Sequence, residues 1–200
     1  VTIETSSKPR VTEQENYYHQ LCFNLRARSS RAPAFYARVN FQPSSLDAFD
    51  VYVRDSGQPY GPKGSCLIYG WACNLEALGD YRDKYNSEMI SDRQGRCPHV
   101  HWNIAVPNGA YLVTVTIGDL VAATQVGGCS LQGQHLTNGS HVVPAGHYER
   151  FERTVAVAGG QISLGSAYGD GKGLTCQSSL SSVSIAQLGD DGAAAVPHEY

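Results

Sequence analysis

The strongest constraint on the fold is the regular alternation of apolar and polar side chains between His99 and Asp119. Every second position on each side of a Pro-Asn-Gly turn at 107–109 is apolar: Val100, Trp102, Ile104, Val106, Tyr111, Val113, Val115 and Ile117. Successive side chains of a strand point to opposite faces, so this period of two predicts two strands with one buried face each. The segment therefore predicts a β-hairpin.

Short strands separated by turn residues are expected along the rest of the chain. They are predicted at 22–29, 36–41, 50–54, 66–71, 129–135, 151–157, 161–166 and 180–188. A second hairpin is expected around Gly159 and Gly160, because alternating apolar residues flank this turn. The only helical candidate is a turn or two within 74–85, which also fits a loop. Since each strand buries one face and needs a second sheet against it, we expect an all-β antiparallel sandwich.

The two ends of the chain fall outside this pattern. Residues 1–20 are polar apart from a short alternating stretch at the start, and residues 189–200 read GDDGAAAVPHEY. We therefore expect an N-terminal arm at 1–20, one sandwich domain at 21–188 and a C-terminal tail at 189–200.

Six cysteines are distributed along the chain without any Cys-x-x-Cys pair. Zinc ribbons and redox motifs need that short spacing, so a disulfide framework in an oxidising compartment is favoured. Asn138 begins an Asn-Gly-Ser glycosylation triplet. The chain starts at Val1 without a signal-peptide pattern, as a secreted chain does after signal removal. Together these features predict a secreted, extracellular protein.

The charge balance limits the classes of partner. The chain carries 15 basic and 18 acidic residues with no long run of either sign. A nucleic-acid partner is not expected, because such proteins present a basic patch. No apolar run approaches the length of a membrane span, so no membrane partner is expected either.

His99 and His101 raise the question of a metal site. Two positions apart on a strand, their side chains point to the same face, which is a geometry that metal sites use. No motif supplies a third ligand, and that face is opposite the apolar one. Asp119 follows a glycine at a strand end, and a carboxylate can be a calcium ligand, but no ligand cluster accompanies it. We interpret these residues as structural and predict no metal and no cofactor.

Several motifs carry a resemblance to a known family. They are NFQP at 40–43, YG at 60–61, LIYGW at 67–71, YRDKY at 81–85, WNIAVPNGAYLVTVTIGD at 102–119 and ERTVAVAGGQISL at 152–164. In this order they resemble the galactose-binding-like, malectin-like carbohydrate-binding modules. The resemblance implies a jelly-roll β-sandwich and a glycan as partner.

A cluster of planar and aromatic side chains is the candidate binding site for that glycan. Sugar recognition needs an aromatic face and planar polar groups. The loop predicted between two strands supplies Tyr81, Arg82, Asp83, Tyr85 and Asn86, with Tyr60 or Tyr69 nearby. We call residues 81–86 the predicted lip. The alternative is that Arg82 and Asp83 form a structural ion pair within a long loop.

The first and last strands of a jelly roll often lie side by side, which bears on the disulfides. On that basis Cys22 is expected to pair with Cys176, leaving Cys66 for Cys129. Cys73 and Cys97 bracket the long loop between two predicted strands and are expected to bond to each other.

No pattern of catalytic residues is evident. There is no Gly-x-Ser-x-Gly elbow, and the acidic residues between 76 and 92 contain no spacing that selects a catalytic pair. We expect a non-catalytic protein that binds glycans outside the cell. The alternative is a structural subunit of an extracellular fibre or coat, a homo-oligomer or filament. In that case Val1 and Ile3 of the arm would add a strand to a neighbouring copy.

Overall fold

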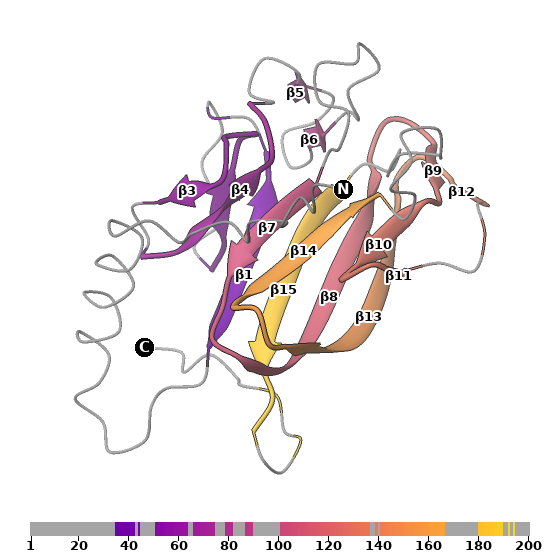
Figure 1. The fold of residues 1–200 in the computed structure, drawn as a ribbon. Helices are drawn as coiled ribbons and strands as arrows, with labels where there is room; N and C mark the ends of the chain where they lie inside the picture. The colour runs from indigo at the N-terminus through magenta and orange to yellow at the C-terminus, as the bar shows by residue number, and fades with distance from the viewer. Residues whose placement is uncertain are drawn as a thin grey trace, which may run out of the picture.

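The computed structural model describes residues 35–42, 44, 51–63, 66–74, 79–81, 87–89, 101–136, 139, 141–166, 180–189, 192 and 194. The regular structure of this part consists of β-strands arranged in two main sheets that pack face to face (Figure 1). The expected all-β antiparallel sandwich is confirmed. No helix within the described residues is long and apolar enough to cross a membrane.

The first sheet has five strands. Their order is β13 (His147–Val157), β8 (Gly109–Asp119), β15 (Leu180–Gln187), β1 (Tyr36–Phe41) and β2 (Val53–Asp55). Neighbours pair antiparallel except β1 and β2, which are parallel. Strands β1 and β15 lie side by side, although nearly the whole described chain separates them in sequence (Figure 1).

The second sheet has six strands. Their order is β11 (Gln134–His135), β10 (Cys129–Leu131), β14 (Gln161–Ser166), β7 (His101–Ala105), β4 (Ile68–Trp71) and β3 (Gly61–Pro62). Two small sheets complete the described structure: β12 (His141–Val143) with β9 (Thr124–Val126), and β5 (Gly79–Tyr81) with β6 (Ser87–Met89). The segment 74–85, the one helical candidate, thus contains strand β5.

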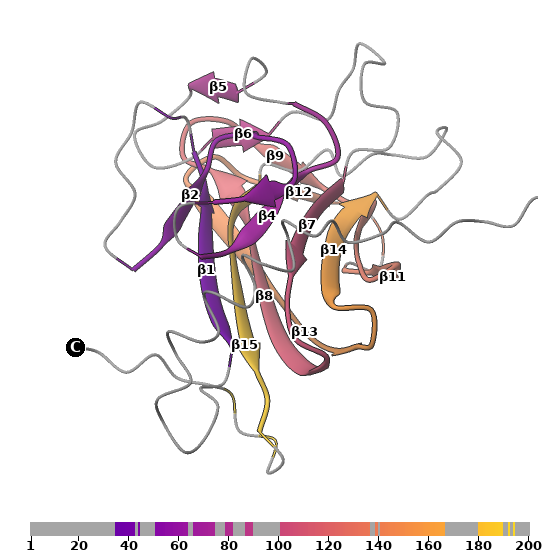
Figure 2. The same ribbon diagram turned by 60° about the vertical axis from the view of Figure 1, so that its left-hand side comes forward.

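Both expected hairpins are wrong, because each pair of strands is divided between the two sheets. Strand β7 pairs with β4 and β14, whereas β8 pairs with β13 and β15. The turn at Gly159 and Gly160 likewise leads from β13 in the first sheet to β14 in the second. The turned view in Figure 2 separates the two layers. Alternation shows only that one face of a strand is buried. Two consecutive strands can bury that face while lying side by side in one sheet or while facing each other from two sheets, so alternation does not distinguish these arrangements.

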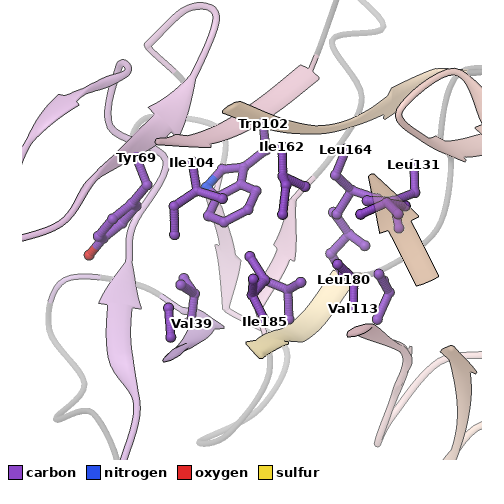
Figure 3. Packing of buried hydrophobic residues seen from close by; sticks show 14 of the residues in the cluster. Val39, Tyr69, Trp102, Ile104, Val113, Leu131, Ile162, Leu164, Leu180 and Ile185 are labelled. Carbon is purple, nitrogen blue, oxygen red and sulfur yellow. The ribbon is translucent and has the colours of Figure 1, made fainter. Parts of the chain in front are cut away.

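The core fills the space between the two sheets (Figure 3). Trp102, Ile104 and Ile162 point down from the second sheet toward Val39 and Ile185 of the first. Their exposed fractions are at most 1%. The alternating residues of the sequence therefore build one core, as expected for a sandwich.

Two glycines of the recognised motifs lie where another backbone passes closely. A Cβ at Gly70, whose φ is +137°, would lie 2.6 Å from the carbonyl oxygen of Pro59. A Cβ at Gly118, whose φ is +155°, would lie 2.3 Å from the carbonyl oxygen of His147. Both positions require glycine for space and for backbone conformation. The glycines of the YGW and IGD motifs are thus explained by packing.

Candidate functional site

The predicted lip lies almost entirely outside the described residues. Tyr81 belongs to β5, and its side chain is not among the described ones; the same holds for all of 82–86, including Arg82, Asp83, Tyr85 and Asn86. Tyr60 is half-buried, and its backbone N–H donates to the carbonyl of Trp71 at 2.8 Å. Asn138, Val1 and Ile3 also lie outside the described residues. The predictions for all of these residues stay predictions.

Three of the six cysteines can be described. Cys66, Cys73 and Cys129 are each disulfide-bonded. Cys22, Cys97 and Cys176 lie outside the described residues, so the connectivity stays a prediction.

A buried carboxylate ties the two sheets together near β2. Asp55, 1% exposed, accepts hydrogen bonds on Oδ1 from Trp71 Nε1 at 3.0 Å and from the Gly57 N–H at 2.8 Å. Its Oδ2 accepts one from Trp102 Nε1 at 2.8 Å. Burial raises the pKa of the Asp55 carboxyl, while the three donors act in the opposite direction. No ligand reaches a group so deeply buried, so Asp55 has a structural role.

The tyrosine of the YGW motif makes a second link between the sheets. The hydroxyl of Tyr69 on β4 donates to the backbone carbonyl of Arg54 on β2 at 2.6 Å. Burial and the nearby Asp55 charge raise the pKa of Tyr69 well above its usual range. Lys63 places its ammonium 5.5 Å from the centre of the Tyr69 ring. Tyr69, named above as a candidate neighbour of the predicted lip, is thus part of the framework that holds β2 in position.

The side of the first sheet that faces away from the core carries the polar groups most suited to a ligand. We call this side the outer face. The strand register places Arg38 beside Ser184, Ser184 beside Thr114, and Thr114 beside Glu152. Residues paired in this way point to the same side of a sheet. One polar row therefore crosses four strands, from β1 to β13.

Two further rows flank this one. The first joins Arg54, Asn40, Ser182, Thr116 and Arg150. The second joins Tyr36, Ala186, Leu112 and Thr154. Small side chains occupy most of the two central strands, whereas arginine, tyrosine and glutamate side chains occupy the flanking strands.

Arg38 lies close to two tyrosine rings at the β1 side of the outer face. Its guanidinium carbon is 5.3 Å from the ring centre of Tyr36 and 5.7 Å from that of Tyr52. Its Nε is buried and has no hydrogen-bond partner. Burial raises the pKa of Tyr36, although the Arg38 charge acts against this shift. Within the described residues, no carboxylate forms an ion pair with Arg38. Among the described residues, the guanidinium thus has aromatic rings and no carboxylate as its neighbours.

The opposite side of the outer face is formed by β13. Thr114 donates from Oγ1 to Glu152 Oε1 at 3.3 Å, and Arg150 and Glu152 are both exposed. The face as a whole combines stacking rings, a planar cation and hydroxyl groups. This combination can stack on the apolar side of a sugar ring and hydrogen-bond its hydroxyls.

Sequence reasoning missed the outer face because its parts come from distant segments. Strand β1 was expected at 36–41, and its alternate residues Tyr36, Arg38 and Asn40 were a visible polar signal. Tyr52 reaches Arg38 through the parallel pairing of β1 with β2. Such a pairing across an intervening loop leaves no periodic signal in the sequence.

Of the positions considered for metals, Asp119 has a structural role. Asp119 is 1% exposed, and its Oδ1 accepts the backbone N–H groups of Val121 at 2.7 Å and Ala122 at 2.9 Å. It closes the turn after β8. His101 lies on β7, and His99 is outside the described residues. In the part of the chain that the structure describes, no three His, Cys, Asp or Glu side chains gather as metal ligands would.

The chain was compared with known proteins. No protein-family model matches it, and no curated protein matches it. Among solved structures it is similar to the YXIM protein of Bacillus subtilis, with 21% identity and a TM-score of 0.43, over 78% of this chain and 41% of that one.

Two other solved structures show a comparable likeness. Bacteroides uniformis beta-glucuronidase 2 has 14% identity and a TM-score of 0.46, over 77% of this chain and 18% of that one. The plant receptor-like kinase ANX2 has 14% identity and a TM-score of 0.40, over 76% of this chain and 48% of that one. The chain thus spans less than half the length of each of these proteins. All three likenesses are distant, and none assigns an activity to this chain.

Proposed function

We propose that this chain is a non-catalytic glycan-binding protein that acts outside the cell, and that the outer face binds the sugar. The observation that carries the proposal is the position of Arg38, close to the rings of Tyr36 and Tyr52 and paired with Ser184 on the neighbouring strand. The extracellular location rests on the six cysteines without a Cys-x-x-Cys pair and on the Asn138 triplet.

The chemistry of the outer face favours an acidic sugar. Among its described residues are Arg38, Arg54 and Arg150 and one acid, Glu152, although the whole chain carries a formal net charge of −3. A guanidinium presents two parallel N–H donors that fit a carboxylate, which makes a uronic acid a matching ligand. The serine and threonine hydroxyls of the central strands supply donors and acceptors for the sugar hydroxyls.

A glycan array followed by calorimetry tests this proposal, with acidic and neutral oligosaccharides as separate arms. Tyr36→Ala, Tyr52→Ala and Arg38→Gln should each weaken binding by roughly 1 to 3 kcal/mol, because each removes a direct contact. Val142→Ala is the control, since this exposed side chain lies on β12, outside the first sheet. Equal binding by wild type and all three variants would contradict the outer face as the site.

The predicted lip is the competing location for the same function. Tyr81→Ala and Tyr85→Ala should weaken binding by roughly 1 to 3 kcal/mol, with an unchanged melting temperature, if the lip binds the sugar. Loss in the lip variants with retention in the Tyr36 and Tyr52 variants would move the site to the lip. A wild type that binds no glycan on the array would contradict glycan binding altogether.

The alternative is a structural subunit that assembles through its N-terminal arm. The observation that keeps it in view is the long strand β13 at the edge of the first sheet, because an edge can accept an added strand. Deleting residues 1–20 should then leave a folded monomer that forms no large assemblies, as measured by light scattering. Unchanged assembly after the deletion would exclude this role of the arm.

A further inference from the structure

Strand β13 is an eleven-residue strand at the edge of the first sheet as the structure describes it. It runs from His147 to Val157 and pairs along its whole length with β8. Within the described residues, no strand pairs with its other side. Most of its side chains are exposed, while Glu149 and Phe151 are half-buried and Val155 and Val157 are buried. In an antiparallel ladder every second residue points its backbone N–H and C=O away from the paired neighbour, so a long edge presents a row of such groups.

The order of charges along β13 is complementary to itself. The central residues read Glu149, Arg150, Phe151, Glu152 and Arg153. When a second copy runs antiparallel with Phe151 opposite Phe151, Glu149 lies opposite Arg153. In the same register Arg150 lies opposite Glu152. All four charged residues of each copy then face an opposite charge.

Neighbouring registers do not have this property. In a symmetric dimer of this kind the two-fold axis is perpendicular to the sheet and passes beside one residue of β13, which then lies opposite its own copy. Each alternative register places a different residue of β13 at the axis. With the axis at Arg150 two arginines meet, and with the axis at Glu152 two glutamates meet. Like charges directly opposite each other are destabilising in a sheet. The register centred on Phe151 is thus favoured over its neighbours.

We propose that two copies of this chain pair through β13, antiparallel and centred on Phe151. The two five-stranded first sheets then join into one continuous sheet with a two-fold axis at its centre. Phe151 is half-buried against the core cluster of its own chain. Glu149, now bonded to His141 at 2.8 Å, and Arg153, which donates to the Leu136 carbonyl at 3.1 Å, lie at the side of the strand that faces the second sheet. Arg150 and Glu152 lie on the outer face, where both are exposed.

A charge-swap series in the full-length chain tests this pairing by sedimentation velocity. Arg150→Glu and Glu152→Arg should each raise the dimer dissociation constant by about tenfold or more, because each places like charges opposite each other at two symmetry-related points. The double variant Arg150→Glu/Glu152→Arg restores opposite charges and should regain the dimer. Arg54→Glu is the matched control, since it makes the same charge change on β2 at the other end of the sheet.

A covalent trap gives an independent readout. Residues opposite each other in an antiparallel pair have Cα atoms about 4.5 to 5.5 Å apart, which suits a disulfide. Phe151→Cys should therefore form a disulfide-linked dimer, whereas Ala156→Cys, also on β13 but away from the axis, should not. The pairing is wrong if the wild type stays monomeric up to millimolar concentration, or if the double variant dimerises no better than the single ones. It is also wrong if deleting residues 1–20 abolishes a dimer that the charge swaps leave unchanged.

Discussion

The hydrogen bonds around Asp55 make a specific prediction about stability. Three N–H donors point at the two oxygens of this carboxylate, which accepts and does not donate. Asp55→Asn keeps the shape of the side chain but replaces one oxygen with an NH2 group. If the amide oxygen keeps Trp71 and Gly57, the NH2 group meets the indole N–H of Trp102, and both donors lose their partner.

The size of the effect follows from the burial of these groups. Trp102 is 0% exposed and Asp55 is 1% exposed, so water replaces neither partner. A hydrogen bond to a charged group contributes about 1.5 to 3 kcal/mol, and leaving a buried donor unpaired costs about 1 to 3 kcal/mol. Asp55→Asn also removes a buried charge, which offsets part of this loss of stability. The total effect of the single variant therefore does not equal the strength of the hydrogen bond, and the interaction energy between Asp55 and Trp102 is the quantity to measure.

A double-mutant cycle isolates it. Asp55→Asn, Trp102→Phe and the double variant are unfolded in urea, and the free energies of unfolding are compared. We expect a coupling of about 1.5 to 3 kcal/mol in favour of the native pair, since charge removal and lost indole packing cancel in the cycle. A coupling within about 0.5 kcal/mol of zero, the error of additivity for independent sites, would refute the account of Asp55 as the link between the sheets.

Further predictions concern pH, packing and the disulfides. Because burial raises the pKa of the Asp55 carboxyl in the folded chain, the folded chain keeps the carboxyl proton to higher pH than the unfolded chain. The free energy of unfolding should therefore fall as the pH rises from about 4 through the pKa of the folded chain. Asp55→Asn should abolish this pH dependence, as measured by urea unfolding at several pH values. Gly70→Ala should lower the free energy of unfolding by more than about 1 kcal/mol, as measured by denaturation, since its Cβ would lie 2.6 Å from the Pro59 carbonyl oxygen. Non-reducing peptide mapping should find Cys73 linked to Cys97, a bond worth about 3 kcal/mol by loop closure; a different partner for Cys73 would contradict that pairing.

The sequence predicted the strands and the core better than their arrangement. Alternation identified Trp102, Ile104, Val113 and Val115 as inward-facing, and all four are buried. The same alternation suggested that the two strands pair side by side, whereas they lie in opposite sheets. A strand with one apolar face must pack that face against another apolar surface. Its alternation pattern does not specify which strands pair with its two edges.

The buried carboxylate of Asp55 shows a second limit of prediction from sequence. Asp55 directly follows the strand predicted at 50–54, and nothing nearby in sequence marks it as buried. Its partner Trp102 was correctly expected in the core because it lies in an alternating apolar pattern, and its partner Trp71 is buried as well. Their indole N–H groups still need an acceptor when they are buried. Two buried tryptophans signal that a polar partner exists, while the fold alone shows which residue it is.

The outer face and the edge pairing together predict how binding depends on the length of the glycan. Pairing through β13 would place two outer faces on the same side of one continuous sheet. From β1 of one copy to β1 of the other there are seven strand steps, three in each copy and one across the axis, or about 34 Å at about 4.8 Å per step. A long glycan that spans this separation would engage both Arg38 residues and gain avidity, whereas a short oligosaccharide would engage one.

Glu152→Arg should therefore weaken binding of the long glycan far more than that of the short one in calorimetry. Equal losses for both lengths would mean that Glu152 contacts the sugar itself and that the two faces act separately.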